Sequence, residues 1–282
     1  MAIGIIPYIG GKHRLSGAIA ERLHATGADC LVDVFGGSAA VTLNCGFKKR
    51  IYNDASGDLV VLFRVLADPL MRREFLRRLR WTPASRRIYA DGYNRYRECG
   101  FSFAYIIDPI ERAAAVFFRH QFAFGGKVRS GGFQVSMKDH RYIKEVARYQ
   151  NALRRVVGIG DLFRTVLIEN LHYQDAISMY GKRSNVVLFC DPPYWGTEKY
   201  YAGSFGAADH FFLAQALAEC EAPVVATFYD HPRIRSLYPE AIWHWDPIIA
   251  TKNSQFCARN KTKVAEMILT RHGDRSCVRI GA

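Results

Sequence analysis

The strongest constraint on the fold is a strand-like segment that runs directly into two consecutive prolines. Residues 186–190 (VVLFC) form a short apolar run, which indicates a buried strand. Asp191 follows this run and precedes the proline pair and Tyr194. A proline has no N–H for the hydrogen-bond ladder of a sheet and fixes its own φ, so a central strand cannot continue through two of them. The strand must therefore end at Asp191, with the loop DPPY at its carboxyl end.

Two earlier segments also combine a short strand with a chemically suggestive loop. Residues 30–35 (CLVDVF) are followed by a glycine pair and a helix-like segment, and residues 50–56 (RIYNDAS) read as a second strand that ends near Asp54. Ligands of open α/β sheets bind at the carboxyl ends of the strands, so we expect these loops to share one crevice with DPPY. A carboxylate placed like Asp54 holds a ribose hydroxyl pair in such folds. The pattern indicates a site for a nucleoside cofactor.

Strand-like and helix-like segments alternate at both ends of the chain, whereas the middle is helical and basic. Arginines crowd residues 72–97, and the alternation resumes after about residue 160. Alternation of this kind favours an α/β sheet covered on both faces. We therefore predict one catalytic domain formed by residues 1–57 and 160–282, with an inserted, mainly helical domain at 58–159.

The charge of the chain favours a polyanionic partner. Lys and Arg number 39 against 26 Asp and Glu, which gives a formal net charge of +13. Attraction to phosphates is the simplest use of such an excess and favours nucleic acid over a membrane; a basic protein without such a partner is the alternative. No stretch reaches the roughly 18 apolar residues that would span a bilayer. The seven cysteines contain no C-x-x-C pair, so we expect a cytoplasmic protein with no metal site.

Taken together, the motifs resemble those of the Dam-type DNA adenine-N6 methyltransferases, in which GGK precedes the glycine loop and DPPY follows the inserted domain. Residues 8–12 (YIGGK) are similar to the family's aromatic-x-G-G-K element, DVFGGSAAV to its F-x-G loop and YNDAS to its acidic loop. Further on, ATFYDHPRIRSLY and NKTKVAEMIL resemble its last two segments. The resemblance covers nearly the whole chain. It implies a Rossmann-like S-adenosylmethionine-dependent methyltransferase sheet with an inserted, basic DNA-recognition domain.

The resemblance also implies the cofactor, the partner and the residues that hold the cofactor. The cofactor would be S-adenosyl-L-methionine, and the partner would be double-stranded DNA, with no obligate protein partner. Four side chains would line the cofactor and two residues would shape its pocket: Tyr8, Lys12, Asp54 and Asp191, and then Phe35 and Gly37.

In an enzyme of this family, DPPY would prepare an adenine amino group for methylation. The amino nitrogen is a poor nucleophile because its lone pair is delocalised into the ring. The Asp191 carboxylate and the Pro192 carbonyl, held rigid by Pro192 and Pro193, would accept its hydrogens and turn the lone pair towards the methyl group. Tyr194 would stack on an adenine extruded from the duplex. Transfer would be direct and in line, without a covalent enzyme intermediate.

DNA contact is expected from the segment RHQFAFGGKVRSGGFQV. Two glycine pairs flank Lys127 and Arg129 between aromatic residues, and Arg119 precedes them, which favours a loop that enters a groove. This segment is only loosely similar to the family's target-reading hairpin, because Gln134 stands where Asn is usual. The glycine loop also departs from the family pattern, because Ala39 replaces a usual glycine.

Two other interpretations stay open at the level of sequence. DPPY does not by itself choose the amine, so methylation of cytosine N4 or of RNA is an alternative within the same chemistry. The second is a relative that has lost catalysis and only binds DNA, an idea motivated by the altered hairpin and Ala39. The motifs do not encode the recognition sequence, a restriction nuclease partner, a phage or chromosomal role, or the oligomeric state.

Overall fold

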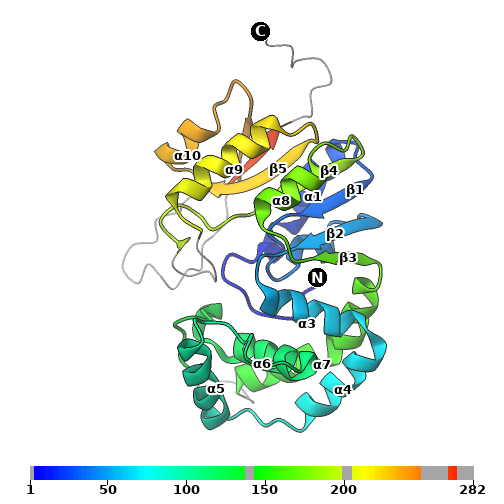
Figure 1. Ribbon diagram of the computed structural model, residues 1–282, viewed down its shortest axis with the longest axis vertical. Coiled ribbons are helices and arrows are strands. Elements are labelled where there is room, and N and C mark those ends of the chain that lie inside the picture. Colours follow the sequence, from blue (N-terminus) through cyan, green and yellow to red (C-terminus); the bar gives the residue numbers. More distant parts are fainter. Residues whose placement is uncertain (1–2, 137–142, 199–204, 249–265, 272–282) are drawn as a thin grey trace.

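The computed structural model describes residues 3–136, 143–198, 205–248 and 266–271, and this part of the chain contains one mixed sheet (Figure 1). Seven strands form the order β3-β2-β1-β4-β5-β7-β6. Their bounds are β1 Cys30–Asp33, β2 Lys49–Asn53, β3 Val166–Glu169, β4 Val186–Cys190, β5 Val224–Tyr229, β6 His244–Ile248 and β7 Glu266–Arg271. The sheet confirms the predicted α/β class and is consistent with a Rossmann-like methyltransferase fold.

The strand directions bring the predicted loops to one edge of the sheet. β1 pairs in parallel with β2 and β4, β2 pairs with β3, and β4 pairs with β5. β7 runs antiparallel between β5 and β6, and its first residue, Glu266, pairs with Tyr229 at the end of β5. The carboxyl ends of β1, β2 and β4 and the amino end of β7 therefore meet at the same edge.

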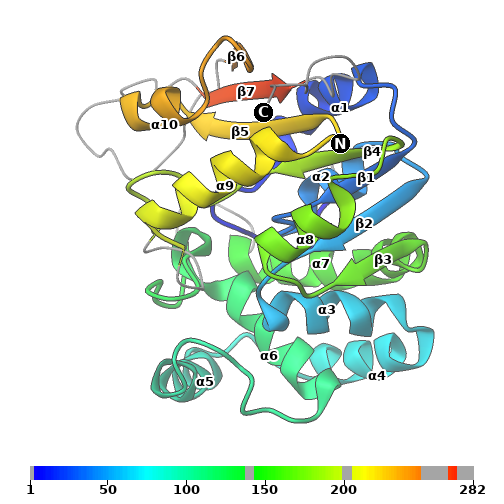
Figure 2. The ribbon, with the colours of Figure 1, turned by 45° about the horizontal axis from the view of Figure 1, so that its top comes forward.

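Helices cover both faces of the sheet: α1 (Ser16–Ala25), α2 (Ala40–Asn44), α8 (Tyr173–Tyr180), α9 (Ala207–Glu219) and α10 (Pro232–Leu237). Val32 and Leu188 lie in one core cluster with α8, α9 and α10, whereas Leu31 and Val187 pack with α1 and α2 on the opposite face. Figure 2 shows α8 and α9 lying across one face of the strands. Burial on both faces explains why the strands are nearly continuous apolar runs in the sequence.

Between β2 and β3 the described chain forms α3 (Gly57–Ala67), α4 (Pro69–Arg80), α5 (Arg86–Glu98), α6 (Pro109–Phe122) and α7 (Lys144–Phe163), which make the lower half of the molecule in Figure 1. The Phe63 ring of α3 stacks on Phe163 of α7 at 4.5 Å, and Tyr52 of β2 meets both rings edge-on at 5.0 and 6.0 Å. The helical segment therefore shares its core with the sheet. α7 also runs past residue 160, where the sequence placed the end of the insertion.

Local sequence explains where two of these helices begin. The Asp68 carboxylate accepts hydrogen bonds from two backbone N–H groups of the first turn of α4, and Pro69 occupies the first helical position. α6 begins in the same way after Asp108. An acidic side chain satisfies N–H groups that have no partner within the helix, and proline brings no N–H at a position that needs none.

Within the described residues, no helix is long and apolar enough to cross a bilayer. Five cysteines there are free thiols, and of these only Cys99 is exposed. Cys257 and Cys277 lie outside the described residues, as does the first part of the expected last motif, residues 260–265.

Candidate active site

A cleft opens at the edge of the sheet where the predicted loops meet. It has a volume of about 240 Å³ and is lined by the N-terminal segment and by the loops that follow β1, β2 and β4. All of the residues expected to hold the cofactor line it: Tyr8, Lys12, Phe35, Gly37, Asp54 and Asp191. Folding thus assembles one site from motifs that are far apart in the sequence.

Lys12 is a buried cation held between two carboxylates. Only 5% of its side chain is exposed, and its Nζ lies 2.7 Å from Asp191 Oδ1 and 3.2 Å from Glu266 Oε1. Nζ also donates a hydrogen bond to the Gly10 carbonyl at 2.8 Å. Burial alone would lower the pKa of Lys12, but Asp191 and Glu266 outweigh burial, so the pKa is raised. Lys12 therefore stays charged and fixes the Asp191 carboxyl in place.

The Asp191 carboxyl has one occupied oxygen and one available oxygen. Oδ1 accepts hydrogen bonds from Lys12 Nζ and from the hydroxyl of Thr227, each at 2.7 Å. Among the described residues, no hydrogen bond reaches Oδ2. Burial raises the pKa of Asp191 above its usual value, although the Lys12 charge and the hydrogen bonds oppose this. The group is thus a preoriented acceptor with raised basicity at the edge of the cleft.

The turn after β1 explains why this loop is rich in glycine. Gly37 has φ of +51°, and a Cβ atom there would lie 3.0 Å from the Tyr8 ring. The Gly37 N–H donates to Asp54 Oδ2 at 2.8 Å, which ties the glycine turn to the loop after β2. Ala39, where the sequence departs from the family pattern, is also left-handed, with φ of +57°. Glycine adopts that conformation without strain, which accounts for the family's usual residue at this position.

Asp54 is half-buried, and both of its carboxylate oxygens accept hydrogen bonds from the backbone. Oδ1 accepts from the Ser56 N–H at 2.8 Å, and Oδ2 accepts from Gly37. Burial raises the pKa of Asp54, although these two bonds oppose the shift. Each carboxylate oxygen has a second lone pair, so Asp54 can still accept hydrogen bonds from a ligand in the cleft.

Aromatic rings form one wall of the cleft. The Phe35 ring stacks on Tyr173 at 5.6 Å and meets Phe205 edge-on at 5.9 Å. His172 and Tyr173, which follow β3, also line the cleft. Flat apolar surfaces of this kind suit a ligand with an aromatic ring.

Tyr194 follows the proline pair and is held from several sides. Its side chain is 5% exposed, and its hydroxyl donates to Glu266 Oε1 at 2.6 Å. The Tyr229 ring meets it edge-on at 4.3 Å, and Lys12 Nζ lies 4.8 Å from its centroid. Pro193 is among the described residues that line the cleft, whereas Pro192 and Tyr194 are not. The loop thus has a rigid base.

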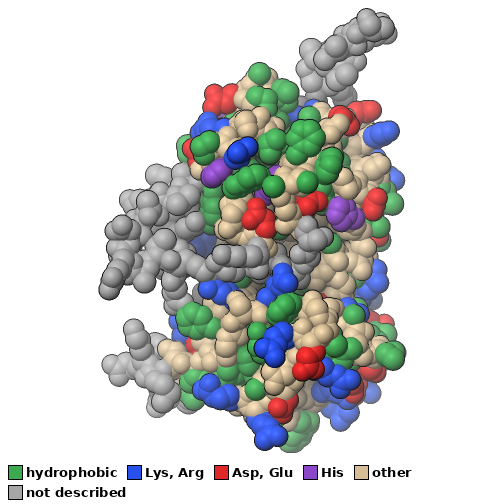
Figure 3. Space-filling view, turned by 60° about the vertical axis from the view of Figure 1, so that its left-hand side comes forward, with side chains coloured by type: hydrophobic (Ala, Val, Ile, Leu, Met, Phe, Trp, Pro, Cys, Tyr) green, Lys and Arg blue, Asp and Glu red, His purple; other side chains and the backbone are tan. Residues whose placement is uncertain are grey.

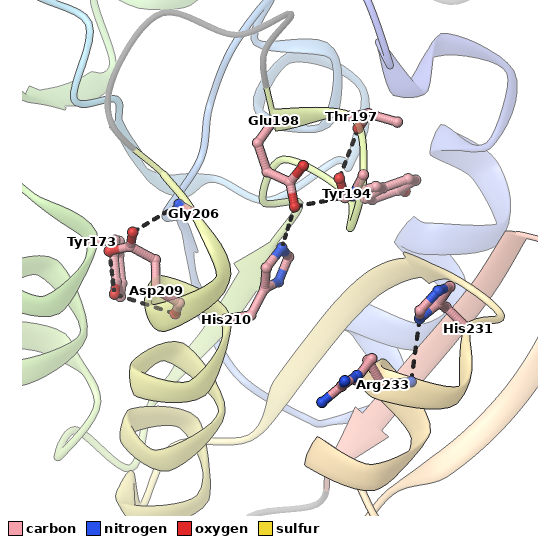
Figure 4. A network of polar contacts seen from close by, with 10 residues as sticks. Tyr173, Tyr194, Thr197, Glu198, Gly206, Asp209, His210, His231 and Arg233 are labelled. Carbon is pink, nitrogen blue, oxygen red and sulfur yellow. Dashed lines mark hydrogen bonds and ion pairs between the residues drawn. The ribbon is translucent and has the colours of Figure 1, made fainter.

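Figure 4 shows how the turn after DPPY is anchored. The Thr197 N–H and hydroxyl both donate to the Tyr194 carbonyl at 2.8 Å. Glu198 Oε1 accepts from the Gly196 N–H at 3.0 Å and lies 3.3 Å from Nε2 of His210, a fully buried residue of α9. These contacts fix the position of the DPPY loop relative to α9.

The three expected DNA-binding residues have different environments. Arg119 is 3% exposed, and its guanidinium donates to the Val128 carbonyl at 2.9 and 2.6 Å and to the Gly131 carbonyl at 3.1 Å. This placement does not suit the direct DNA contact expected from the sequence, because the guanidinium is occupied by carbonyls of its own loop. Lys127 and Arg129 are half-buried on the same loop.

The sequence matches the D12 class N6 adenine-specific DNA methyltransferase family over residues 8–248. The chain belongs to this family. The match begins at Tyr8 and includes the loops after β1, β2 and β4 that line the cleft. The expected family is therefore confirmed, and adenine N6 is favoured over cytosine N4 or RNA as the target.

Known relatives carry names of the same kind. The chain is 26% identical to the DNA adenine methylase of Serratia marcescens over 281 residues, 93% of this chain and 96% of the relative. It is 25% identical to the DNA adenine methylase of Escherichia coli (strain K12) over 253 residues, 85% of each chain. It is also 25% identical to the DNA N-6-adenine-methyltransferase of Escherichia phage P1 over 260 residues, which is 85% of this chain and 31% of the relative.

Three residues of this D12-family site were missed in the sequence. Glu266 reaches Lys12 and Tyr194 because β7 is antiparallel, and Thr227 reaches Asp191 from β5. The only local signal for Glu266 is that it is an acid at the start of the last strand. The only local signal for Thr227 is that it is a polar residue within an apolar strand. Asp33, the acid that ends β1, had the clearest signal, because it lies three residues before the glycine pair that begins at Gly36.

Asp33 is 1% exposed and lines the cleft. Its Oδ2 accepts from the Thr42 hydroxyl at 2.6 Å, whereas Oδ1 is buried without a partner in the described chain. Burial raises the pKa of Asp33 to about 7, and the nearby Asp191 and Asp54 add to the shift while Thr42 opposes it.

Proposed function

We propose that this protein transfers a methyl group from S-adenosyl-L-methionine to the N6 amino group of adenine in duplex DNA. The observation that carries the proposal is the Asp191 carboxyl, which has one oxygen fixed by Lys12 and Thr227 and the other available beside the rigid proline pair. Membership of the D12 family supports adenine as the base.

The chemistry of the cleft fits this cofactor. Asp54 has acceptor oxygens for the ribose hydroxyls, and the Phe35 and Tyr173 rings form an apolar wall for an adenine ring. Asp33 Oδ1, which lacks a partner within the described residues, would accept from the ammonium group of the methionine part. Tyr8, Lys12 and Gly37 complete the proposed pocket. When bound, the cofactor supplies a methyl group on a positively charged sulfur.

The residues of DPPY would then activate the amine. Asp191 Oδ2 and the Pro192 carbonyl would accept the two amino hydrogens and direct the lone pair at the methyl carbon. The new N–C bond forms as the S–C bond breaks, so positive charge develops on N6. The Asp191 carboxylate would stabilise that charge and would accept the proton that N6 loses. Its raised pKa favours this acceptance.

Tyr194 would stack on an adenine flipped out of the duplex. Its hydroxyl is already bound to Glu266, and Lys12 lies against its ring, so the ring has one fixed orientation before the base arrives. A preoriented ring loses little side-chain entropy on binding, and stacking contributes ~1–3 kcal/mol per base in single-strand binders. Pro193 would restrict movement of the loop when the flipped adenine binds.

The helical segment at 58–159 would supply the DNA surface. It carries the loop with Lys127 and Arg129, which we assign to DNA contact, while Arg119 would hold that loop from inside. The formal net charge of +13 supports a polyanionic partner. We infer that no obligate protein partner is needed and that the protein works in the cytoplasm, where its scattered thiols stay reduced.

The first test is chemical analysis of methylated DNA. Purified protein is incubated with unmethylated plasmid and S-adenosylmethionine, and the digested nucleosides are identified by mass spectrometry. We expect N6-methyladenine with the wild type and at least a ~100-fold lower rate with Asp191→Asn, which keeps the size of the side chain but removes the basic oxygen pair. Asp91→Asn, an exposed acid on α5, is the matched control and should retain full activity.

The other outcomes would each change the proposal. N4-methylcytosine would keep the mechanism and alter the base. Absence of any methylated base, together with no cofactor binding by calorimetry, would make the protein a DNA-binding relative without catalysis. A wild-type rate in Asp191→Asn would remove Asp191 from its assigned role.

A further inference from the structure

The loop that carries Lys127 and Arg129 is closed at its base. Ala123 and Phe133 form an antiparallel bridge. Phe124 N–H donates to the Gly132 carbonyl at 2.9 Å, and Gln134 N–H donates to the Phe122 carbonyl at 2.8 Å. Residues 123–133 are called the basic loop from here on. Because its ends are pinned together, the cations on it have a defined position.

One face of α5 holds the basic loop. The Tyr89 hydroxyl donates to the Gly131 carbonyl at 2.5 Å, and the Tyr93 hydroxyl donates to the Arg129 carbonyl at 3.0 Å. The Arg119 guanidinium lies between these two rings, 4.3 Å from the Tyr89 centroid and 4.2 Å from that of Tyr93. Tyr89 and Tyr93 are four residues apart, so both point from the same side of the helix.

Arg86 continues this face to the start of α5. It stands three residues before Tyr89 and seven before Tyr93, which places it on the same side of the helix. Its guanidinium lies 5.3 Å from the centroid of Phe133, the residue that closes the basic loop. The side chain is exposed, and no carboxylate of the described residues forms an ion pair with it. Arg86 thus lies beside the loop as a cation that no carboxylate of the described chain neutralises.

Arg87 provides the contrast within the same helix turn. It is equally basic and exposed, but it points along the adjoining face, where its Nε lies 3.2 Å from Asp91 Oδ2. The two neighbouring arginines differ in pairing: the Arg86 guanidinium lies against a ring of the basic loop, whereas Arg87 is paired with an acid of its own helix. Figure 3, which brings the α5 side of the molecule forward, shows several Lys and Arg side chains gathered on its lower, helical part.

We propose that Arg86 binds a backbone phosphate of duplex DNA next to the site of the basic loop, so that the DNA surface extends from the loop onto the start of α5. The inference rests on the proposed function, because it assumes that the basic loop faces DNA. A phosphate is the partner that suits Arg86, since the residue lies outside the loop, is exposed, and presents a planar donor fork that matches phosphate oxygens. Such a contact fixes register without reading sequence.

The test measures the salt dependence of binding to a fluorescent DNA duplex in three variants. One phosphate contact contributes about 0.9 to the slope of log K against log[salt]. Raising the salt from about 50 to about 200 mM weakens DNA binding by the wild type. The corresponding fold-loss of affinity in Arg86→Gln should be about 3.5 times smaller. Arg86→Lys keeps the charge and should retain the wild-type slope. Arg87→Gln makes the same charge change one residue away and should also retain it.

Each other result has a definite meaning. An unchanged slope in Arg86→Gln, or an equal fall in Arg87→Gln, would overturn the assignment of Arg86 while leaving the proposed methyltransferase function intact. A loss of slope in Arg86→Lys would show that ring packing matters and not charge, which also overturns it. If the wild type does not bind duplex DNA and forms no N6-methyladenine, the proposed function itself fails. Equal thermal unfolding of the variants confirms that the fold is preserved.

Discussion

The Asp191 carboxyl, to which we assign the acceptor role, owes its properties to a few neighbouring side chains. Lys12 lies between Asp191 and Glu266, and Glu266 in turn binds the Tyr194 hydroxyl. Burial and the cation act in opposite directions on the pKa of Asp191, and burial prevails, so the carboxyl is more basic than in water. The lysine of the GGK motif therefore acts mainly on the DPPY motif, because it holds the acid that we propose accepts the amino hydrogens.

A residue-scale prediction follows from Asp33, whose pKa is raised to about 7 by burial. Below that pH the carboxyl is protonated, and it must lose its proton to pair with a cationic ammonium group. The affinity for S-adenosylmethionine should therefore rise with pH, by at most about tenfold per unit below 7, and level off above it. Calorimetry of wild type and Asp33→Asn across this range tests the prediction. The same slope in Asp33→Asn would assign the proton to another buried acid.

At the scale of elements, the basic loop is built on α5 and α6. Arg119 of α6 is buried among tyrosines of α5, and burial lowers its pKa even though the rings favour the charge. Its donors are directed at the Val128 and Gly131 carbonyls. The buried charge of Arg119 is stabilised only when the loop presents these carbonyls to it. Arg119 is therefore a positioning residue for Lys127 and Arg129.

Arg119→Lys separates this positioning role from direct DNA contact. Lysine keeps the charge but has no planar fork that can bind two loop carbonyls at once. We expect a loss of about 1–3 kcal/mol in the free energy of unfolding, because buried carbonyls lose charged hydrogen bonds. DNA binding should weaken, while cofactor affinity measured by calorimetry should stay unchanged. A variant with wild-type stability and wild-type salt slope would instead support a phosphate contact.

The sequence predicted elements and motif loops well where local rules operate. The DPPY proline pair ended a strand, and the glycine turn at Gly37 followed one, so both loops were expected at one edge of the sheet. The burial of Arg119 was not expected, because it depends on tyrosines of another helix and nothing in the local pattern reports that contact. Glu266 was missed for a similar reason: it reaches the site only because β7 runs antiparallel to its neighbours. Long-range packing and strand direction decided both cases.

At the scale of the whole molecule, the helical segment and the sheet share one core. Tyr52 of β2 packs against Phe63 and Phe163, and Val60 and Val156 lie buried in the same cluster. The basic loop also contacts the cleft directly, since a Cβ atom on Gly126 would lie 3.3 Å from the Tyr8 carbonyl carbon. The surface proposed to read DNA is therefore rigidly connected to the pocket proposed to hold the cofactor.

This shared core predicts that the chain unfolds as one cooperative unit. Far-UV and near-UV circular dichroism should give coincident denaturant transitions for the full chain, because the packed faces of α3 and α7 cannot stay buried without β2. The excised segment 58–159 should lack a cooperative transition, since it loses Tyr52, Phe163 and the sheet and leaves the Phe63 ring exposed to water. Replacing Tyr52 with alanine in the full chain should lower the free energy of unfolding by about 3–5 kcal/mol without splitting the transition. Two separate transitions, or a stably folded excised segment, would show instead that the helical part is an autonomous domain whose contact with the sheet is dispensable.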